Sequence, residues 1–140
     1  MYKKAHPAAL TSPKKVLIME DDEMTRDILS KIISNYFMCE VNVATSSNEA
    51  RSYISARSYD LFIIGNSDSA SMPRDIIEKI KEQFRNTPLI VVLGDCTDND
   101  ISLLREKGID KIIYKPLKLT SFLEIVAGAF LEREQIYNFA

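Results

Sequence analysis

Four consecutive acidic residues, Glu20, Asp21, Asp22 and Glu23, follow the first apolar run of the chain. Neighbouring carboxylates repel each other and raise each other's pKa, so such a group favours a compensating metal ion or ammonium group. Mg²⁺ binds proteins through one or two carboxylates and several water molecules. An ordinary helix start is the second interpretation, because the helix dipole favours acids in the first turn. It accounts for Asp22 and Glu23, whereas both interpretations stay open for Glu20 and Asp21.

A lysine stands in a comparable position near the other end of the chain. Tyr114-Lys115-Pro116 closes the last apolar run, and the proline fixes the backbone φ of the following turn. If both runs are parallel strands of one sheet, this lysine lies at the same edge as the acidic residues. We therefore expect Lys115 to reach the carboxylates of Glu20 and Asp21.

The elements that position these residues follow from an alternation of short apolar runs and longer segments of helical periodicity. Most runs are continuous, which is typical of parallel strands covered by helices on both faces. The pattern predicts a doubly wound α/β fold whose functional crevice lies at the carboxyl ends of its strands. The five predicted strands are Val16–Met19, Val41–Ala44, Leu61–Ile64, Leu89–Leu93 and Lys111–Tyr114.

Several helix ends carry capping signals. Ser46 with Glu49, and Ser121 with Glu124, have the spacing of a capping box, in which the side chains satisfy free backbone N–H groups of the first turn. Gly108 is expected to end the fourth helix, because glycine readily adopts the left-handed conformation found there.

The composition is that of one folded domain. The chain has 140 residues, 46% of them hydrophobic and 27% charged, which excludes disordered, collagen-like and disulfide-framed proteins. We assign residues 1–13 to a flexible tail, 14–135 to the domain and 136–140 to a C-terminal end. The net charge is −2, and residues 1–15 hold four lysines and no acid, so the rest of the chain is more negative, which disfavours nucleic acid as a partner. No apolar run approaches the length of about 20 residues that a membrane span needs.

Cysteine and histidine give no sign of a metal site. Cys39 and Cys96 lie far apart without metal-ligand spacing, so we expect free thiols in a reducing, cytoplasmic compartment. His6 is the only histidine and belongs to the tail. A histidine-dependent triad, a histidine-based zinc site and a phosphotransfer histidine therefore have no support.

Four local patterns together identify a family. They are Val16-Leu17-Ile18-Met19-Glu20-Asp21-Asp22 with Arg26, Tyr59-Asp60-Leu61, Thr87-Pro88-Leu89-Ile90, and Gly108-Ile109-Asp110 leading into Lys115-Pro116-Leu117. With them the chain resembles, from Lys14 to about Glu134, the receiver domain of two-component response regulators. The resemblance implies a flavodoxin-like fold, a five-stranded parallel sheet in the order 2-1-3-4-5 with helices on both faces.

The resemblance also implies roles for the residues at the sheet edge. In the family, an acidic pair after the first strand binds Mg²⁺, and an aspartate ending the third strand accepts a phosphoryl group. A Ser or Thr ending the fourth strand contacts that group, and a lysine after the fifth forms a salt bridge with it. Glu20 and Asp21 match the acidic pair, and Lys115 matches the lysine.

Three positions depart from the family pattern. Counting along the third strand puts Gly65 at the acceptor position, and counting along the fourth puts Leu93 at the Ser/Thr position. Ile112 replaces the switch aromatic three residues before the lysine. A second register inserts four residues before Met72-Pro73, which then matches the family's Met-Pro turn, and puts Ser69 at the acceptor position.

These departures predict a pseudo-receiver, a non-enzymatic signalling module that acts without aspartyl phosphorylation. Because Lys115 competes for Glu20 and Asp21, we expect Mg²⁺ to bind there weakly or not at all, and no other cofactor. One alternative is a phosphorylatable receiver that uses Mg²⁺ and a displaced acceptor, Asp68, three residues after Gly65. The other is a small-molecule-binding flavodoxin-like domain, which the scarcity of glycine and the missing nucleophile–base pair disfavour.

The partner is expected to be another signalling protein, bound to a monomer or a homodimer. In the family, most contacts use the face built from the fourth helix, fifth strand and fifth helix. In this chain that face offers Ile112, Tyr114 and Lys118, together with the end of the last helix.

Overall fold

The computed structural model describes the backbone of residues 13–139 and the side chains of residues 13–133. The predicted flexible tail, residues 1–13, lies outside the described residues except for Pro13. Of the C-terminal end predicted for residues 136–140, the backbone is described as far as Phe139, and it belongs to helix α5.

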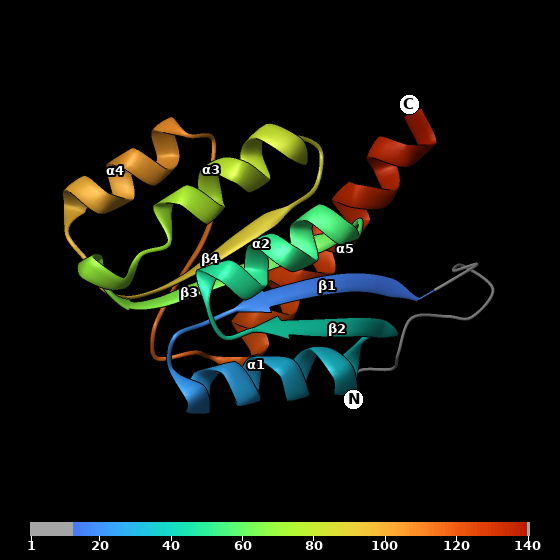
Figure 1. The fold of residues 1–140 in the computed structure, drawn as a ribbon. Coiled ribbons are helices and arrows are strands. Elements are labelled where there is room, and N and C mark those ends of the chain that lie inside the picture. Colours follow the sequence, from blue (N-terminus) through green and yellow to red (C-terminus); the bar gives the residue numbers. More distant parts are fainter. Residues whose placement is uncertain (1–12, 140) are drawn as a thin grey trace.

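Five strands and five α-helices alternate along the described chain (Figure 1). The strands form one parallel sheet in the order β2-β1-β3-β4-β5, which confirms the predicted fold and strand order. A short 3-10 helix, η2, lies between β3 and α3. The elements are β1 Lys14–Met19, α1 Glu23–Tyr36, β2 Cys39–Ala44, α2 Ser47–Ala56, β3 Leu61–Asp68, η2 Ser69–Ser71, α3 Arg74–Gln83, β4 Leu89–Asp95, α4 Asp98–Glu106, β5 Lys111–Tyr114 and α5 Leu119–Phe139.

Helices cover both faces of the sheet, and each face has its own apolar core. Helices α2, α3 and α4 pack on one face, and α1 and α5 on the other (Figure 1). Because successive side chains of a strand point to opposite faces, β1 contributes to both cores. Leu17 belongs to the core under α2, α3 and α4, whereas Val16 and Ile18 belong to the core under α1 and α5. The continuous apolar runs of the sequence therefore reflect strands that are buried on both sides.

Two of the predicted helix ends are confirmed and one is wrong. Ser46 is the N-cap of α2 and accepts a hydrogen bond from the Glu49 backbone N–H at 3.1 Å. Gly108 follows α4 with a left-handed φ of 85°. Ser121, by contrast, does not cap α5, because that helix begins two residues earlier at Leu119. Its backbone bonds already include Phe122 N–H donating to the Lys118 carbonyl.

Strand β3 is longer than predicted, and glycine on the neighbouring strand allows this. The apolar run ends at Ile64, but β3 continues to Asp68, which pairs with Asp95 of β4. A Cβ atom on Gly94 would lie only 2.3 Å from the Ser67 carbonyl oxygen. Any other residue at position 94 would therefore push the end of β3 away from β4.

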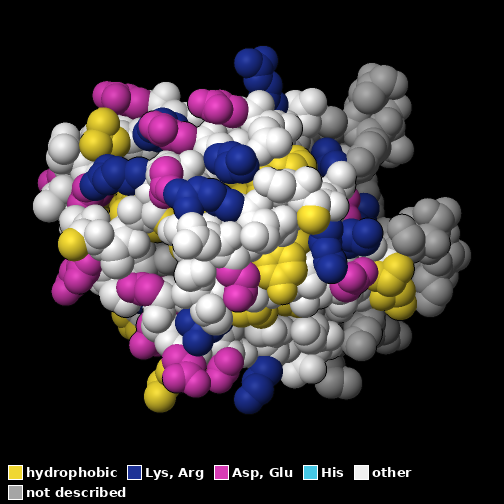
Figure 2. All heavy atoms as spheres, viewed as in Figure 1, with side chains coloured by type: hydrophobic (Ala, Val, Ile, Leu, Met, Phe, Trp, Pro, Cys, Tyr) yellow, Lys and Arg dark blue, Asp and Glu magenta, His cyan; other side chains and the backbone are white. Residues whose placement is uncertain are grey.

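Charged side chains of both signs are interspersed over the face seen in Figure 2.

Among the described helices, none combines the length and hydrophobicity that crossing a membrane requires. Cys39 and Cys96 are both free and half-buried.

Two glycines offer a matched test of the backbone. We expect Gly108→Ala to lower the free energy of unfolding by about 1–2 kcal/mol, because its left-handed φ is costly for a residue with a Cβ atom. Gly128→Ala should instead raise it by up to about 1 kcal/mol, since Gly128 lies in helix α5 with nothing near its missing Cβ. Chemical denaturation of both variants checks the pair, and equal effects would contradict this account.

Candidate functional site

The site lies at the carboxyl edge of the sheet, where β1 and β5 end on either side of β3 and β4. The Glu20 carboxylate is buried, with 1% of the residue exposed, and its Oε1 lies 2.7 Å from Lys115 Nζ. Its Oε2 accepts a hydrogen bond from Asp22 N–H at 3.3 Å. The structure therefore brings together Lys115 and Glu20, as the sequence predicts.

Gly65 makes room for the buried carboxylate. Met19 of β1 is paired with Ile64 of β3, so the next residues, Glu20 and Gly65, are neighbours at the sheet edge. A Cβ atom on Gly65 would lie 2.4 Å from Glu20 Oε1 and 2.8 Å from its Cδ. The Glu20 carboxyl thus occupies space that any side chain at position 65 would need.

The other acidic residues have separate partners. The Asp21 side chain is exposed and accepts a hydrogen bond from Ser67 Oγ at 3.1 Å. Asp22 is the N-cap of α1 and accepts from the Thr25 N–H at 2.9 Å, as expected for an acid at a helix start. Arg26, one turn into α1, donates to the Glu20 carbonyl oxygen at 2.9 Å. The acidic run is therefore divided between the buried site and the start of the helix.

Burial and neighbouring groups shift the pKa values of the two carboxyl groups of the site, Glu20 and Asp21, in opposite directions. Burial raises the pKa of Glu20 to about 6, and a hydrogen bond with Asp21 adds to the rise, while Lys115 opposes it. Burial also acts to raise the pKa of Asp21, but hydrogen bonds with Glu20, Ser67 and Ser71 outweigh it and lower that pKa. Asp21 is therefore the first of the pair to ionise, and Glu20 retains its proton to a higher pH.

The positions where the family has a hydroxyl and an aromatic side chain are apolar and packed. Leu93 is fully buried in the core under α2, α3 and α4, and its carbonyl oxygen accepts from Lys115 N–H at 2.8 Å. Ile112 is half-buried against the same core. The Lys115–Pro116 peptide bond that follows is cis. Neither side chain offers a polar group to the site.

The two other acceptor candidates lie beyond Gly65, and hydrogen bonds engage both. Asp68 ends β3 as the exposed N-cap of η2, and its Oδ1 accepts from Ser71 N–H at 2.9 Å. Ser69 is the first residue of η2, and its hydroxyl donates to the Asp100 carboxylate. Neither of them takes the place beside Glu20, which Gly65 occupies.

A buried aspartate ties this loop to helix α4. Asp100 is 4% exposed and accepts hydrogen bonds from Thr97 N–H at 2.9 Å, from Arg74 at 3.0 Å and from the Ser69 hydroxyl. The bond from Ser69 is the largest cause of a pKa well below the ordinary range of an aspartate. Asp100 therefore remains ionised and joins three segments, η2, the start of α3 and the start of α4.

The donor set at the carboxyl edge does not fit a Mg²⁺ ion well. Glu20 and Asp21 can offer oxygen atoms, but Lys115 already pairs with Glu20, and Gly65 contributes no third carboxylate. No group of three or more metal-ligating side chains occurs among the described residues. An ion at this position would have to displace the ammonium group of Lys115 from a buried partner.

Sequence reasoning missed the contacts of Ser67 at the end of β3 and of Asp100 in α4. Ser67, which contacts Asp21, gave no signal beyond a serine-rich turn. Asp100 did have a signal, since Thr97 stands three residues before it, the spacing of the capping box that the structure contains. Its partners Ser69 and Arg74 are 31 and 26 residues away in sequence, and no local pattern links them.

A family model for the response regulator receiver domain matches residues 16–127. The chain belongs to this family. It is 27% identical over 128 residues to the transcription factor prr1 of Schizosaccharomyces pombe, covering 89% of this chain and 23% of that protein. It is 25% identical to hybrid signal transduction histidine kinase G of Dictyostelium discoideum, covering 83% of this chain and 4% of the kinase. The receiver domain thus spans less than a quarter of these curated relatives.

Solved structures of receiver domains share the fold. A CheY-like response regulator receiver domain protein from Methanospirillum hungatei superimposes with a TM-score of 0.78 at 23% identity, covering 89% of this chain and 98% of that one. A response regulator receiver protein from Pseudomonas putida superimposes with a TM-score of 0.70 at 25% identity, covering 85% of this chain and 99% of that one. Receiver domains act in two-component signalling through contacts with other signalling proteins.

A double-mutant cycle tests the contact between Gly65 and Glu20. We expect Gly65→Ala to lower the free energy of unfolding by about 1–3 kcal/mol, because the new methyl group displaces a buried, paired carboxylate. In a Glu20→Ala background the same change should cost at least about 1 kcal/mol less, since the obstacle is gone. Denaturant titration of the four proteins measures this coupling, and purely additive effects would refute the contact.

The pKa of Glu20 predicts how pH acts on stability. Because this pKa, about 6, exceeds the usual 4.5, the folded protein holds the proton more tightly than the unfolded chain. The contribution of Glu20 to the free energy of unfolding is therefore largest below pH 4.5. It falls by about 2 kcal/mol as the pH rises to about 6 and stays constant above.

An NMR titration of the Glu20 side-chain carboxyl carbon in metal-free buffer measures this pKa directly. Lys115→Met should raise it further by removing the paired cation, whereas Lys118→Met, at an exposed lysine nearby, should leave it unchanged. A Glu20 pKa at or below 4.5 in the unsubstituted protein would disprove the assignment.

Proposed function

We propose that this receiver domain is a pseudo-receiver, which binds a signalling partner without becoming phosphorylated on an aspartate. The observation that carries the proposal is the Glu20 carboxyl group standing within 2.4 Å of the place of a Cβ atom on Gly65. A receiver that transfers phosphate needs a nucleophilic oxygen from this strand position. Here the position supplies a hydrogen atom, and the adjacent space is filled.

The surroundings support this proposal. Phosphoryl transfer depends on holding the nucleophile, the metal ion and the phosphate in one geometry. Lys115, the cation that would contact the phosphate, is paired with Glu20. Leu93 brings no hydroxyl group, and the Asp68 carboxylate is engaged in capping η2. Mg²⁺ is accordingly proposed to bind at Glu20 and Asp21 weakly or not at all.

The proposed contact surface is the face of α4, β5 and α5. Tyr114 and Leu119 are 50% and 45% exposed there, and Lys118 is exposed between them. A depression of about 390 Å³ lies beside them, lined by β5, the β5–α5 loop and the first turns of α5. The combination of exposed apolar side chains and a lysine suits a protein partner with apolar and acidic groups. Curated relatives are a transcription factor and a hybrid histidine kinase by name, which supports a signalling partner.

This proposal includes a cytoplasmic location, because two free cysteines suit a reducing compartment.

Exposure to a small phosphodonor tests the proposal. We expect the intact mass to stay unchanged after incubation with acetyl phosphate and Mg²⁺, while a phosphorylatable receiver domain in a parallel reaction gains one phosphoryl group. The physical reason is that no carboxylate occupies the acceptor position. Asp68→Asn is the matched variant for the displaced acceptor. A mass gain in the unsubstituted protein that disappears in Asp68→Asn would contradict the proposal and show that the domain is phosphorylated on Asp68.

A further inference from the structure

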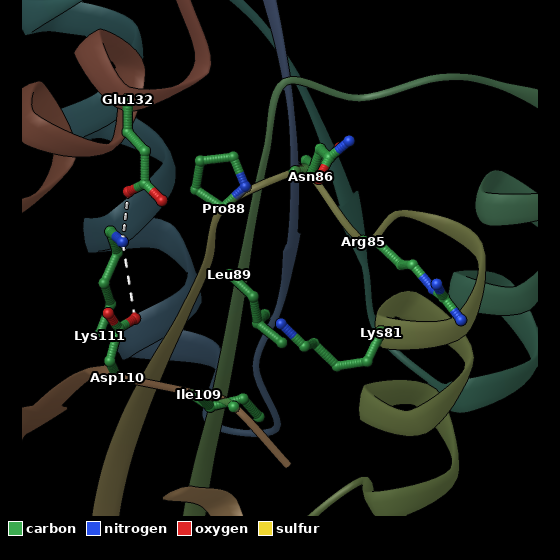
Figure 3. A pocket seen from close by; sticks show the side chains of 11 residues that line it. Lys81, Arg85, Asn86, Pro88, Leu89, Ile109, Asp110, Lys111 and Glu132 are labelled. Atoms are coloured by element: carbon green, nitrogen blue, oxygen red, sulfur yellow. Dashed lines mark ion pairs between the residues drawn. The ribbon is translucent and has the colours of Figure 1, made fainter. Parts of the chain in front are cut away.

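A second polar site lies at the opposite, amino-terminal edge of the sheet. A cavity of about 220 Å³ opens between the end of α3, the α3–β4 loop and the turn before β5 (Figure 3). It shares no residue with the acidic site. The residues that the argument uses are Lys81, Arg85, Asn86, Thr87, Lys111 and Glu132.

Cations outnumber acids around this cavity. Lys111 is balanced by two carboxylates, because its Nζ lies 3.6 Å from Asp110 and 2.5 Å from Glu132. Lys81 and Arg85 have no ion-pair partner within the described part of the chain. The cavity therefore carries a local excess of positive charge on a protein whose net charge is negative.

Lys81 is held at the cavity. It is half-buried in the last turn of α3, and its side chain extends across the cavity toward Leu89 (Figure 3). Its Nζ lies 3.9 Å from the place of a Cβ atom on Gly108, so the Gly108 turn forms the other wall. The dipole of α3 favours a cation here but is not a counter-ion. A partly desolvated ammonium group without an acidic partner is stabilised by an anion.

We propose that this cavity binds a phosphate group. Lys81 supplies a point charge that reaches into the cavity, and Arg85, Asn86 and Thr87 also line it. The Arg85 guanidinium, a planar donor set that matches phosphate oxygens, points away from Lys81 in Figure 3, so Lys81 is the principal contact. The volume lies below the roughly 300–1,000 Å³ of sites for drug-sized molecules, which points to a small ion or a single phosphorylated side chain. Free phosphate and a phosphomonoester on a partner share this chemistry.

The test is a titration followed by amide chemical shifts, with inorganic phosphate and O-phosphoserine as separate probes and sodium chloride at equal ionic strength as the reference. We expect saturable shifts confined to residues 81–89 and 108–111, with dissociation constants of about 1 mM or tighter. Saturation by phosphate alone assigns a free ion, and tighter binding of phosphoserine assigns a modified partner.

Two lysine variants separate a site from general charge. Lys81→Gln should weaken binding of the probe about tenfold, as expected for the loss of one charge-assisted contact. Lys31→Gln removes an exposed lysine of α1 and should leave the affinity unchanged. Shifts that do not saturate, that chloride reproduces, or that Lys81→Gln leaves unchanged would overturn the proposal. The phosphodonor experiment is unaffected by any of these outcomes, because the two sites share no residue.

Discussion

The carboxyl edge of this receiver domain depends on a buried carboxyl group that stands beside a glycine. Taking a carboxylate out of water costs several kcal/mol, and an ammonium partner offsets that cost only in good geometry. Lys115 lies 2.7 Å from Glu20 but offsets the cost only in part, since burial still raises the pKa of Glu20 to about 6, while Gly65 supplies the space. Removing one member of such a pair typically costs about 3–5 kcal/mol, because the other charge is left uncompensated. The pair joins the end of β1 to the end of β5 in the space that Gly65 leaves on β3.

This arrangement changes how the edge can communicate with α4. A phosphorylated receiver shifts a conformational equilibrium because the phosphoryl group binds one state better than the other. Here the corresponding cation is already neutralised, and Leu93 lies in the core. Asp100 of α4 joins that helix to η2 and to the start of α3. These bonds need no added group, so they hold η2 and the start of α3 against α4 in the unmodified protein.

Much of this structure could be predicted from local sequence, and the remainder depends on contacts between distant segments. Continuous apolar runs predict the strands, because double burial leaves no polar positions. Counting along β3 placed Gly65 beside the acidic residues, as the register of Met19 with Ile64 shows. The position of the Glu20 carboxyl group in the space of the missing side chain was not predictable, because it depends on Gly65, 45 residues later in the chain. The extension of β3 was missed for the same reason, since Gly94 on another strand allows it.

The two edges of the sheet differ in how their charges are compensated. In open α/β sheets the carboxyl edge usually receives the ligand, because strand ends and helix N-termini converge there. In this chain polar groups of that edge pair with each other, Lys115 with Glu20 and the Ser67 hydroxyl with Asp21. At the amino edge, Lys81 and Arg85 line the cavity, and neither has an acidic partner among the residues that the structure describes. An anion is therefore better compensated at the amino edge, where it meets free cations, than at the carboxyl edge, where it would have to displace a buried carboxylate from Lys115.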